Sequence, residues 1–158
     1  MDKALSDSDI KPFISNIVRY EELARLDPKQ LLEMLPVAIL YQVGENYGHW
    51  TVLMRTSEGI EHFDPYGIIV DKEFKYLGWQ QPHYLAKLLY QLGEEGIVIN
   101  YNPWRFQKMQ KGINTCGRWI ILRSLFSNWG IDKFADVVEE VSTRLNLTPD
   151  EFVVKTIA

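Results

Sequence analysis

The chain contains a single cysteine, Cys116, whose surroundings suit a nucleophile. It lies in the stretch QKGINTCGRW, where a loop gives way to a strongly apolar helical pattern. A thiol attacks carbonyl carbon efficiently only as a thiolate. The N-terminus of a helix favours that anion, because unpaired backbone N–H groups and the helix dipole are directed at it. Taken alone, though, an isolated cysteine is more often a small buried hydrophobe than a catalyst.

A catalytic cysteine also needs an imidazole, and the chain has three histidines. His83 lies at the start of a predicted helix, where a surface role is the ordinary interpretation, and His62 lies within a predicted strand. His49 opens the strand predicted for residues 49–56, directly after the glycine-containing turn 44–48. It therefore lies at the rim of a sheet, where a side chain can meet another layer, and we predict that it is the partner of the cysteine.

The turn between two predicted strands supplies an acid for this histidine. If Ser57-Glu58 forms a two-residue hairpin turn, Thr51 faces Asp64, and His49 shares their face because side chains alternate along a strand. His49 and Asp64 are then diagonal neighbours, with β-carbons roughly 7 Å apart. A turn at 58–59 leaves them on one face but farther apart. A three-residue loop places them on opposite faces.

An aspartate beside a histidine fixes its tautomer and stabilises the imidazolium. The alternative for Asp64 is an ordinary turn initiator before Pro65. Acyl transfer also builds an oxyanion, which a side-chain amide and the backbone N–H of the nucleophile can stabilise. Gln110 precedes Cys116 with the spacing Q-x5-C, on a loop that returns to the predicted helix, and Gln107 is a less favourable alternative.

The elements that must position these residues alternate between helical and strand patterns. Asp27 caps a helix that begins at Pro28, and the apolar run 37–43 is typical of a strand buried on both faces. The order of elements favours an α+β fold over alternating β-α-β units. The predicted elements are helical pieces within 6–35, strands 37–43, 49–56, 60–64 and 96–100, a loop at 101–114, and helices 81–93 (closed by Gly93), 116–130, 132–146 and 148–157.

Composition limits the class of protein. The 158 residues are expected to form one domain, 1–158, large enough to bury a core without covalent cross-links. A single cysteine excludes an internal disulfide and a multi-cysteine zinc site, and we expect no metal and no cofactor. The polar N-terminus is unlike a signal peptide, and no apolar run reaches the length of a membrane span. An intracellular, reducing location without membrane contact follows, and we expect a monomer.

The net charge of −4 argues against a dedicated nucleic-acid binder, but the charge is unevenly distributed. The segment 97–131 contains no Asp or Glu, and it includes Cys116. One interpretation is chance clustering on a solvated face. The other is a positive field that favours a thiolate or attracts an acidic partner. The five basic residues of this segment are Arg105, Lys108, Lys111, Arg118 and Arg123.

The motifs GHW, FDPYG and Q-x5-C-G, in this chain order, resemble those of the adenain-like cysteine proteases. That group comprises the adenovirus maturation protease and the SUMO and ubiquitin-like-protein proteases. The resemblance covers roughly residues 36–130. The sequence departs from the family in three ways: the chain is shorter than typical SUMO proteases, its acid is Asp64 where adenovirus enzymes have Glu, and Thr115 replaces the Asp usual before the cysteine in SUMO proteases.

The resemblance implies an adenain-like fold of the papain-like superfamily. Such a fold has a central, mostly antiparallel sheet packed against helices, with the nucleophile at the N-terminus of a buried helix. It also implies residue roles: His49 as base, Asp64 as its orienter, Gln110 as oxyanion donor, Cys116 as nucleophile, and Trp50, Gly117 and Trp104 as cleft residues.

The short chain and the FDPYG segment resemble most the small maturation proteases of virophages and polinton-type elements. The resemblance implies a cysteine endopeptidase that cleaves capsid precursors in the host cytoplasm, virus factory or virion, with a nucleic acid or peptide as activator. Three alternatives remain: an isopeptidase for a SUMO- or ubiquitin-like modifier, an acyltransferase, and an inactive scaffold that binds a partner through the basic segment. The chain has little material for the docking lobe that a modifier protease needs.

Overall fold

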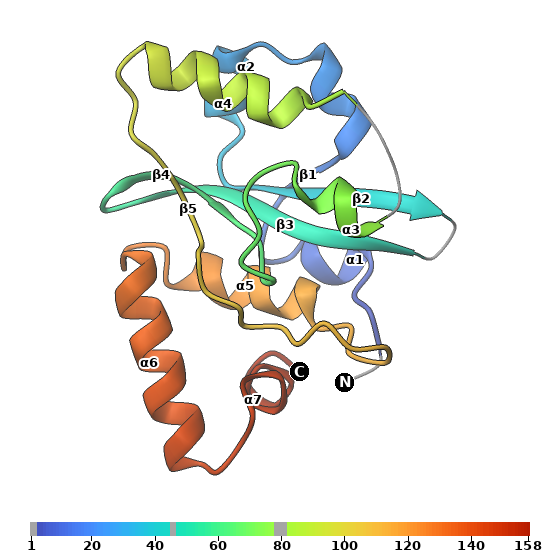
Figure 1. Ribbon diagram of the computed structural model, residues 1–158, viewed down its shortest axis with the longest axis vertical. Coiled ribbons are helices and arrows are strands. Elements are labelled where there is room, and N and C mark those ends of the chain that lie inside the picture. The colour runs from blue at the N-terminus through green and yellow to red at the C-terminus, as the bar shows by residue number, and fades with distance from the viewer. Residues whose placement is uncertain (1–2, 45–46, 78–81) are drawn as a thin grey trace.

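A computed structural model describes residues 3–44, 47–77 and 82–158, in which a five-stranded sheet lies between two layers of helices (Figure 1). The strands follow one another across the sheet in chain order. Their bounds are β1 Asn16–Arg19, β2 Val37–Gly44, β3 Tyr47–Thr56, β4 Gly59–Phe63 and β5 Ile99–Tyr101.

The sheet is mixed, with antiparallel pairing in its centre and a parallel pair at each edge. Strands β2, β3 and β4 form an antiparallel meander, but β1 pairs with β2 in parallel and β4 pairs with β5 in parallel. Parallel neighbours need a crossover connection, which here runs through helices between β1 and β2 and again between β4 and β5. The predicted α+β class is confirmed, and the longer ladders of this mixed sheet are the antiparallel ones.

The turn between β3 and β4 has the first of the three registers considered above. Thr56 pairs with Gly59, so Ser57 and Glu58 form a two-residue turn. Gly59 has a φ of 124°, a backbone conformation that a residue with a side chain adopts only under strain. The ladder continues to Val52 opposite Phe63, and the residue after Phe63 is therefore in line with Thr51.

Helices cover both faces of the sheet (Figure 1). The 3₁₀ helix η1, α2 and α4 pack on one face, and α5, α6 and α7 pack on the other. Strand β3 serves both cores, because Val52 joins the cluster of α5 and α6 while Leu53 joins the cluster of α4. The helices are α1 Asp7–Ile10, η1 Tyr20–Arg25, α2 Pro28–Glu33, α3 Glu73–Leu77, α4 Tyr84–Glu94, α5 Cys116–Leu125, α6 Ile131–Arg144 and α7 Pro149–Thr156.

Helix starts agree with the sequence more closely than other boundaries. Asp27 accepts a hydrogen bond from the Gln30 N–H at the start of α2, and Thr148 caps α7 with Glu151 in a capping box. Gly93, expected to close a helix, lies inside α4. The chain instead turns at Gly96, whose φ is 90°.

Two elements differ from the predicted pattern. Strand β1 lies within the segment 6–35, which was expected to be helical, and helix α3 was not predicted. The turn predicted at 44–48 and the start of the helix predicted at 81–93 fall partly outside the described residues. Within the described part of the chain, every helix is too short or too polar to cross a membrane.

Candidate active site

Three of the predicted residues meet where β3, the end of β4 and the start of α5 come together. His49 Nε2 lies 2.8 Å from Asp64 Oδ1, and the imidazole also interacts with the side chain of Cys116. Since Nε2 faces the carboxylate, Nδ1 is the nitrogen left to face the thiol. The structure thus brings a thiol, an imidazole and a carboxylate into one chain of contacts.

The segment FDPYG holds Asp64 at the end of β4. Its backbone carbonyl accepts hydrogen bonds from the Gly67 N–H at 2.9 Å and from the Asn102 side chain at 2.7 Å. Gly67 has a φ of 72°, and a β-carbon there would lie 2.7 Å from the carbonyl oxygen of Trp104. The glycine that ends this motif is therefore required both by the turn and by the close approach of the loop 102–115.

Tyr66, which the sequence did not single out, supports the histidine from the same turn. Its ring stacks on the imidazole of His49, with centroids 4.6 Å apart and an interplanar angle of 10°. Its backbone N–H donates to Asp64 Oδ1 at 2.7 Å. One oxygen of Asp64 therefore receives two hydrogen bonds, and the imidazole is fixed both by its edge and by its face.

The electrostatics of this group favour an imidazolium. Burial alone would lower the pKa of His49, but the charge of Asp64, its hydrogen bond and the contact with Cys116 outweigh burial and raise that pKa to about 10. Burial would likewise raise the pKa of Asp64, yet the His49 charge and the hydrogen bonds around the carboxylate hold it below its usual range. At neutral pH the pair is therefore cation and anion.

Helix α5 begins at Cys116 itself, as predicted. Thr115 precedes it, and the Thr115 carbonyl accepts the first helical hydrogen bond from the Trp119 N–H. The Thr115 hydroxyl donates to the Asp150 carboxylate at 2.6 Å, and the Lys108 N–H donates to the other oxygen of Asp150 at 3.0 Å. A buried aspartate at the start of α7 thus anchors both the loop and the first turn of α5.

The sequence did not single out Asp150. An aspartate in the first turn of the helix predicted for 148–157 normally faces solvent. Its long-range partners are 35 and 42 residues away in the chain, so no local signal marks them.

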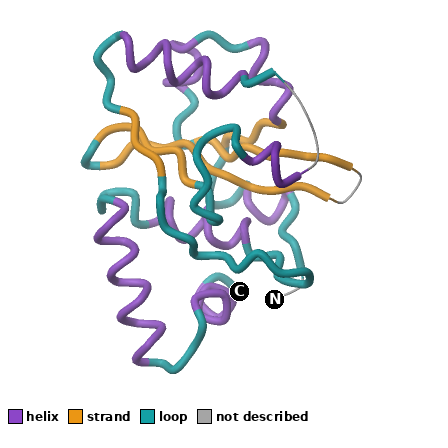
Figure 2. Tube along the Cα trace, in the orientation of Figure 1, coloured by secondary structure: helices purple, strands orange, loops and turns teal. Residues whose placement is uncertain are grey.

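A long loop, residues 102–115, connects β5 to α5 (Figure 2). Its two glutamines differ in their environment. Gln110 is exposed, and its backbone N–H and carbonyl bond to Lys108 and Ile113 within the loop. Gln107 is buried and donates its amide to the Ile113 carbonyl at 3.0 Å and to the Tyr66 hydroxyl at 3.4 Å. The side chain of Gln110 is therefore free of the fixed contacts that hold Gln107.

The predicted cleft residues occupy two different places. Trp50 is buried next to His49, and its indole donates to the Leu5 carbonyl at 3.0 Å. A β-carbon on Gly117 would lie 2.9 Å from the Leu5 side chain. The segment 3–5 therefore crosses the start of α5 beside the thiol. Trp104 is half exposed, and its indole donates to Asp132 at the start of α6.

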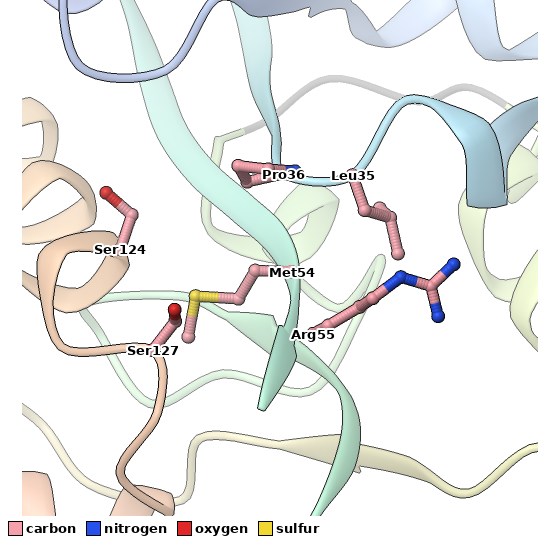
Figure 3. A pocket seen from close by; sticks show the side chains of 6 residues that line it. All are labelled: Leu35, Pro36, Met54, Arg55, Ser124 and Ser127. Atoms are coloured by element: carbon pink, nitrogen blue, oxygen red, sulfur yellow. The ribbon is translucent and has the colours of Figure 1, made fainter. Parts of the chain in front are cut away.

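The thiol and the imidazole are both almost completely buried. His49 is 3% exposed and Cys116 is 6% exposed. A hollow of about 170 Å³ lies between β3 and the end of α5. Figure 3 shows the side chains that line it. A second hollow of about 360 Å³ adjoins the segment 3–5. Neither is lined by His49, Asp64 or Cys116.

The basic segment 97–131 is not a single positive face. Arg123 is fully buried and forms a bidentate ion pair with Glu61 on β4. Arg118 is also buried, where it donates to the Ile157 and Lys3 carbonyls. Three of the five cations, at positions 105, 108 and 111, remain exposed on the loop. The charge available to an acidic partner is therefore smaller than the sequence suggested.

No group of three His, Cys, Asp or Glu side chains within residues 3–44, 47–77 and 82–158 has a geometry that would hold a metal ion.

The two buried histidines are expected to titrate in opposite directions. His49 should remain an imidazolium up to about pH 10. His62 should stay neutral at lower pH than an ordinary histidine does, because burial lowers its pKa and outweighs the charges of Asp64 and Asp71. Nitrogen-15 NMR of histidine side chains would follow both rings. In the Asp64→Asn variant the pKa of His49 should fall towards its ordinary value. A wild-type His49 that titrates near pH 6.5 would contradict the assignment.

Comparison with known proteins links the chain to a virophage. It is 33% identical over 163 aligned residues to "Uncharacterized protein V9" of Sputnik virophage, and the match covers 95% of this chain and 91% of that protein. No protein-family model matches the chain.

Proposed function

We propose that this chain, which belongs to the same family as protein V9 of Sputnik virophage, is a cysteine endopeptidase. The observation that carries the proposal is the contact chain Cys116–His49–Asp64, with the thiol at the first residue of α5. A structural cysteine needs neither an imidazolium nor a helix N-terminus. A nucleophile uses both to become a thiolate.

In the proposed reaction the thiolate of Cys116 attacks a peptide carbonyl, forming a C–S bond and a tetrahedral oxyanion. The backbone N–H of Cys116 and the amide of Gln110 donate to that oxyanion. His49 then gives its proton to the leaving amine, and the C–N bond breaks to leave a thioester. A water molecule, deprotonated by His49, hydrolyses the thioester and restores the thiolate.

We assign the adenain-like fold on the same basis. The antiparallel strands β2 to β4 carry His49 and deliver Asp64, and α5 packs on this part of the sheet with Cys116 at its start. This arrangement agrees with the chain order of the motifs. The parallel pairs at the two edges of the sheet do not contribute side chains to the contact chain.

The proposed substrates are capsid precursors of the virus that encodes the chain. A relative in a virophage supports a role in a viral life cycle. The burial of Cys116 and the close approach of Leu5 to Gly117 favour an extended peptide with small residues at the scissile bond, because bulky side chains would meet the segment 3–5. The wild-type chain should cleave such precursors at defined sites.

The test is cleavage of recombinant capsid precursor, followed by mass spectrometry of the new termini. Cys116→Ser is expected to abolish cleavage. Gln110→Ala should lower kcat by about 10²–10³-fold, the typical cost of removing one oxyanion donor. Gln91→Ala, at an exposed glutamine of α4, is the matched control. A ubiquitin- or SUMO-based probe is offered in parallel. Reaction with the probe and not with the precursor would contradict the capsid proposal and identify a modifier protease.

A further inference from the structure

A second buried carboxyl lies against the aspartate of the site. Glu73, the first residue of α3, is 1% exposed. Neither of its carboxylate oxygens has a hydrogen-bond donor among the described residues, and the same is true of Asp64 Oδ2. The two carboxyl groups are nevertheless close enough for each to influence the ionisation of the other. Three buried carboxylate oxygens without a donor are costly if both groups are ionised, whereas a proton on one carboxyl gives the other the hydrogen-bond donor that it lacks.

The surroundings decide which carboxyl holds the proton. Asp64 faces the imidazolium of His49 and the N–H of Tyr66, both of which favour its ionised form. No cation or comparable donor among the described residues offsets the burial of Glu73. Burial and the interaction with Asp64 therefore raise the pKa of Glu73 well above its usual value. Two adjacent buried carboxyl groups do not both stay ionised, and the proton therefore belongs to Glu73.

The other titratable groups around this pair do not supply a cation to Glu73. Asp71, in the loop before α3, already accepts hydrogen bonds from the Tyr41 hydroxyl of β2 at 2.9 Å and from the Ala86 N–H of α4 at 2.8 Å. Its charge also acts against ionisation of Glu73. His62 of β4 lies within reach of the charges of Asp64 and Asp71, but its own pKa is lowered by burial, so it stays neutral.

We propose that Glu73 is a positioning residue of this site, whose protonated carboxyl donates a hydrogen bond to Asp64 Oδ2. This inference rests on the proposed function, because it concerns the orientation of Asp64 towards His49. With Oδ2 held by Glu73 and Oδ1 held by Tyr66, the carboxylate cannot rotate, and Oδ1 stays directed at the imidazole. The triad becomes a chain of four side chains, in which Glu73 acts through Asp64 rather than on substrate.

A protonated Glu73 has a consequence for stability. Because its folded-state pKa is raised, the stabilisation from its bound proton is fully present below about pH 4.5, the usual value for Glu, and is lost as the pH rises through the folded-state pKa. A glutamine at this position keeps a donor and has no proton to lose. The stability of wild type relative to Glu73→Gln should therefore fall as the pH is raised.

The experiment compares Glu73→Gln, Glu73→Leu and wild type in the rate at which iodoacetamide alkylates Cys116 between pH 5 and 9. The glutamine amide donates as the protonated acid does, so Glu73→Gln should react within about twofold of wild type at neutral pH. Glu73→Leu fills the space but leaves Asp64 Oδ2 without a donor, and its rate at pH 6 should fall about tenfold, the effect of about 1.4 kcal/mol. Glu33→Gln, an exposed glutamate on α2, is the control.

The outcomes separate this inference from the proposed function. If His49→Ala and wild type react alike, the catalytic assignment of Cys116 fails, whatever Glu73 does. If alkylation depends on His49 but Glu73→Leu equals wild type, the positioning role is overturned. Equal losses in Glu73→Gln and Glu73→Leu also overturn it, since the amide should rescue the hydrogen bond. Urea unfolding from pH 4 to 8 gives an independent measure for Glu73→Gln, in case Glu73→Leu does not fold, and a pH-independent difference from wild type would exclude the bound proton.

Discussion

Replacing His49 with alanine is expected to slow the alkylation of Cys116 by iodoacetamide on the order of 10²-fold at pH 6. The imidazolium of His49 contacts the thiol, and its positive charge favours the thiolate. An unpaired thiol, with the ordinary pKa of about 8.5, is less than about 1% thiolate at that pH. Part of the gain is offset because a stabilised thiolate is a less reactive nucleophile, which is why the expected factor is not larger.

The measurement is intact-mass spectrometry after limiting exposure to the reagent, which suits a chain with one cysteine. The difference should narrow as the pH approaches 9, because the unpaired thiol then ionises by itself. His83→Ala is the matched control, since His83 is exposed at the start of α4. A slow reaction in wild type, unchanged in His49→Ala at every pH, would show that the contact is only structural.

Replacing Arg123 with methionine is expected to lower the free energy of unfolding by about 3–5 kcal/mol. Arg123 donates to both oxygens of Glu61, at 2.8 and 2.9 Å, and both side chains are almost completely buried. It also donates to the carbonyls of Phe126 and Trp129, at 3.0 and 2.9 Å. The methionine would fill much of the space but leave a buried carboxylate and two carbonyls without donors, and that desolvation is the main cost.

Urea unfolding at pH 7 would measure the loss, and the double variant Glu61→Leu/Arg123→Met is the informative control. Removing both partners should recover a large part of the stability, because no unpaired charge then remains. The exposed pair Glu140–Arg144 on α6, joined at 2.7 Å, gives the comparison at the surface, where Arg144→Met should cost less than about 1 kcal/mol. If Arg123→Met costs no more than Arg144→Met, the buried pair does not hold α5 to the sheet.

The parts of the fold that could be predicted have local signals. The N-caps at Asp27 and Thr148, the start of α5 at Cys116 and the two-residue turn after Thr56 each depend on a few neighbouring residues. That turn fixed the register of β3 and β4, and with it the side of the sheet from which Asp64 reaches His49. The central meander and its catalytic candidates therefore followed from short-range chemistry.

The parts that could not be predicted depend on long-range partners. Strand β1 is only four residues long, and its sequence NIVR alternates too briefly to be distinguished from the helical pattern around it. Its strand character comes from pairing with β2. Glu73 and Asp150 have the spacing of ordinary first-turn acids, and only the tertiary structure shows that both are buried against the site.

The basic segment shows the same limit for charge. A count of signs along the chain placed five cations near Cys116, but burial assigns Arg123 to Glu61 and Arg118 to backbone carbonyls at the two ends of the described chain. Sequence reveals the presence of a charge. Whether that charge faces solvent or a buried partner depends on how its helix packs. Helix α5 is buried on nearly all sides, so its two arginines have partners inside the protein.

The order of strands has a consequence for how the molecule assembles during folding. His49 and Asp64 are 15 residues apart and are joined by one tight hairpin, so closing that loop costs little entropy and this pair can form early. Cys116 reaches them only after the chain has passed through α4, β5 and the long loop, a much larger closure that slows folding. A nascent chain that ends before α5 would hold the histidine and its acid without the thiol. An unusual reactivity of Cys116 would therefore report that the last helices have docked.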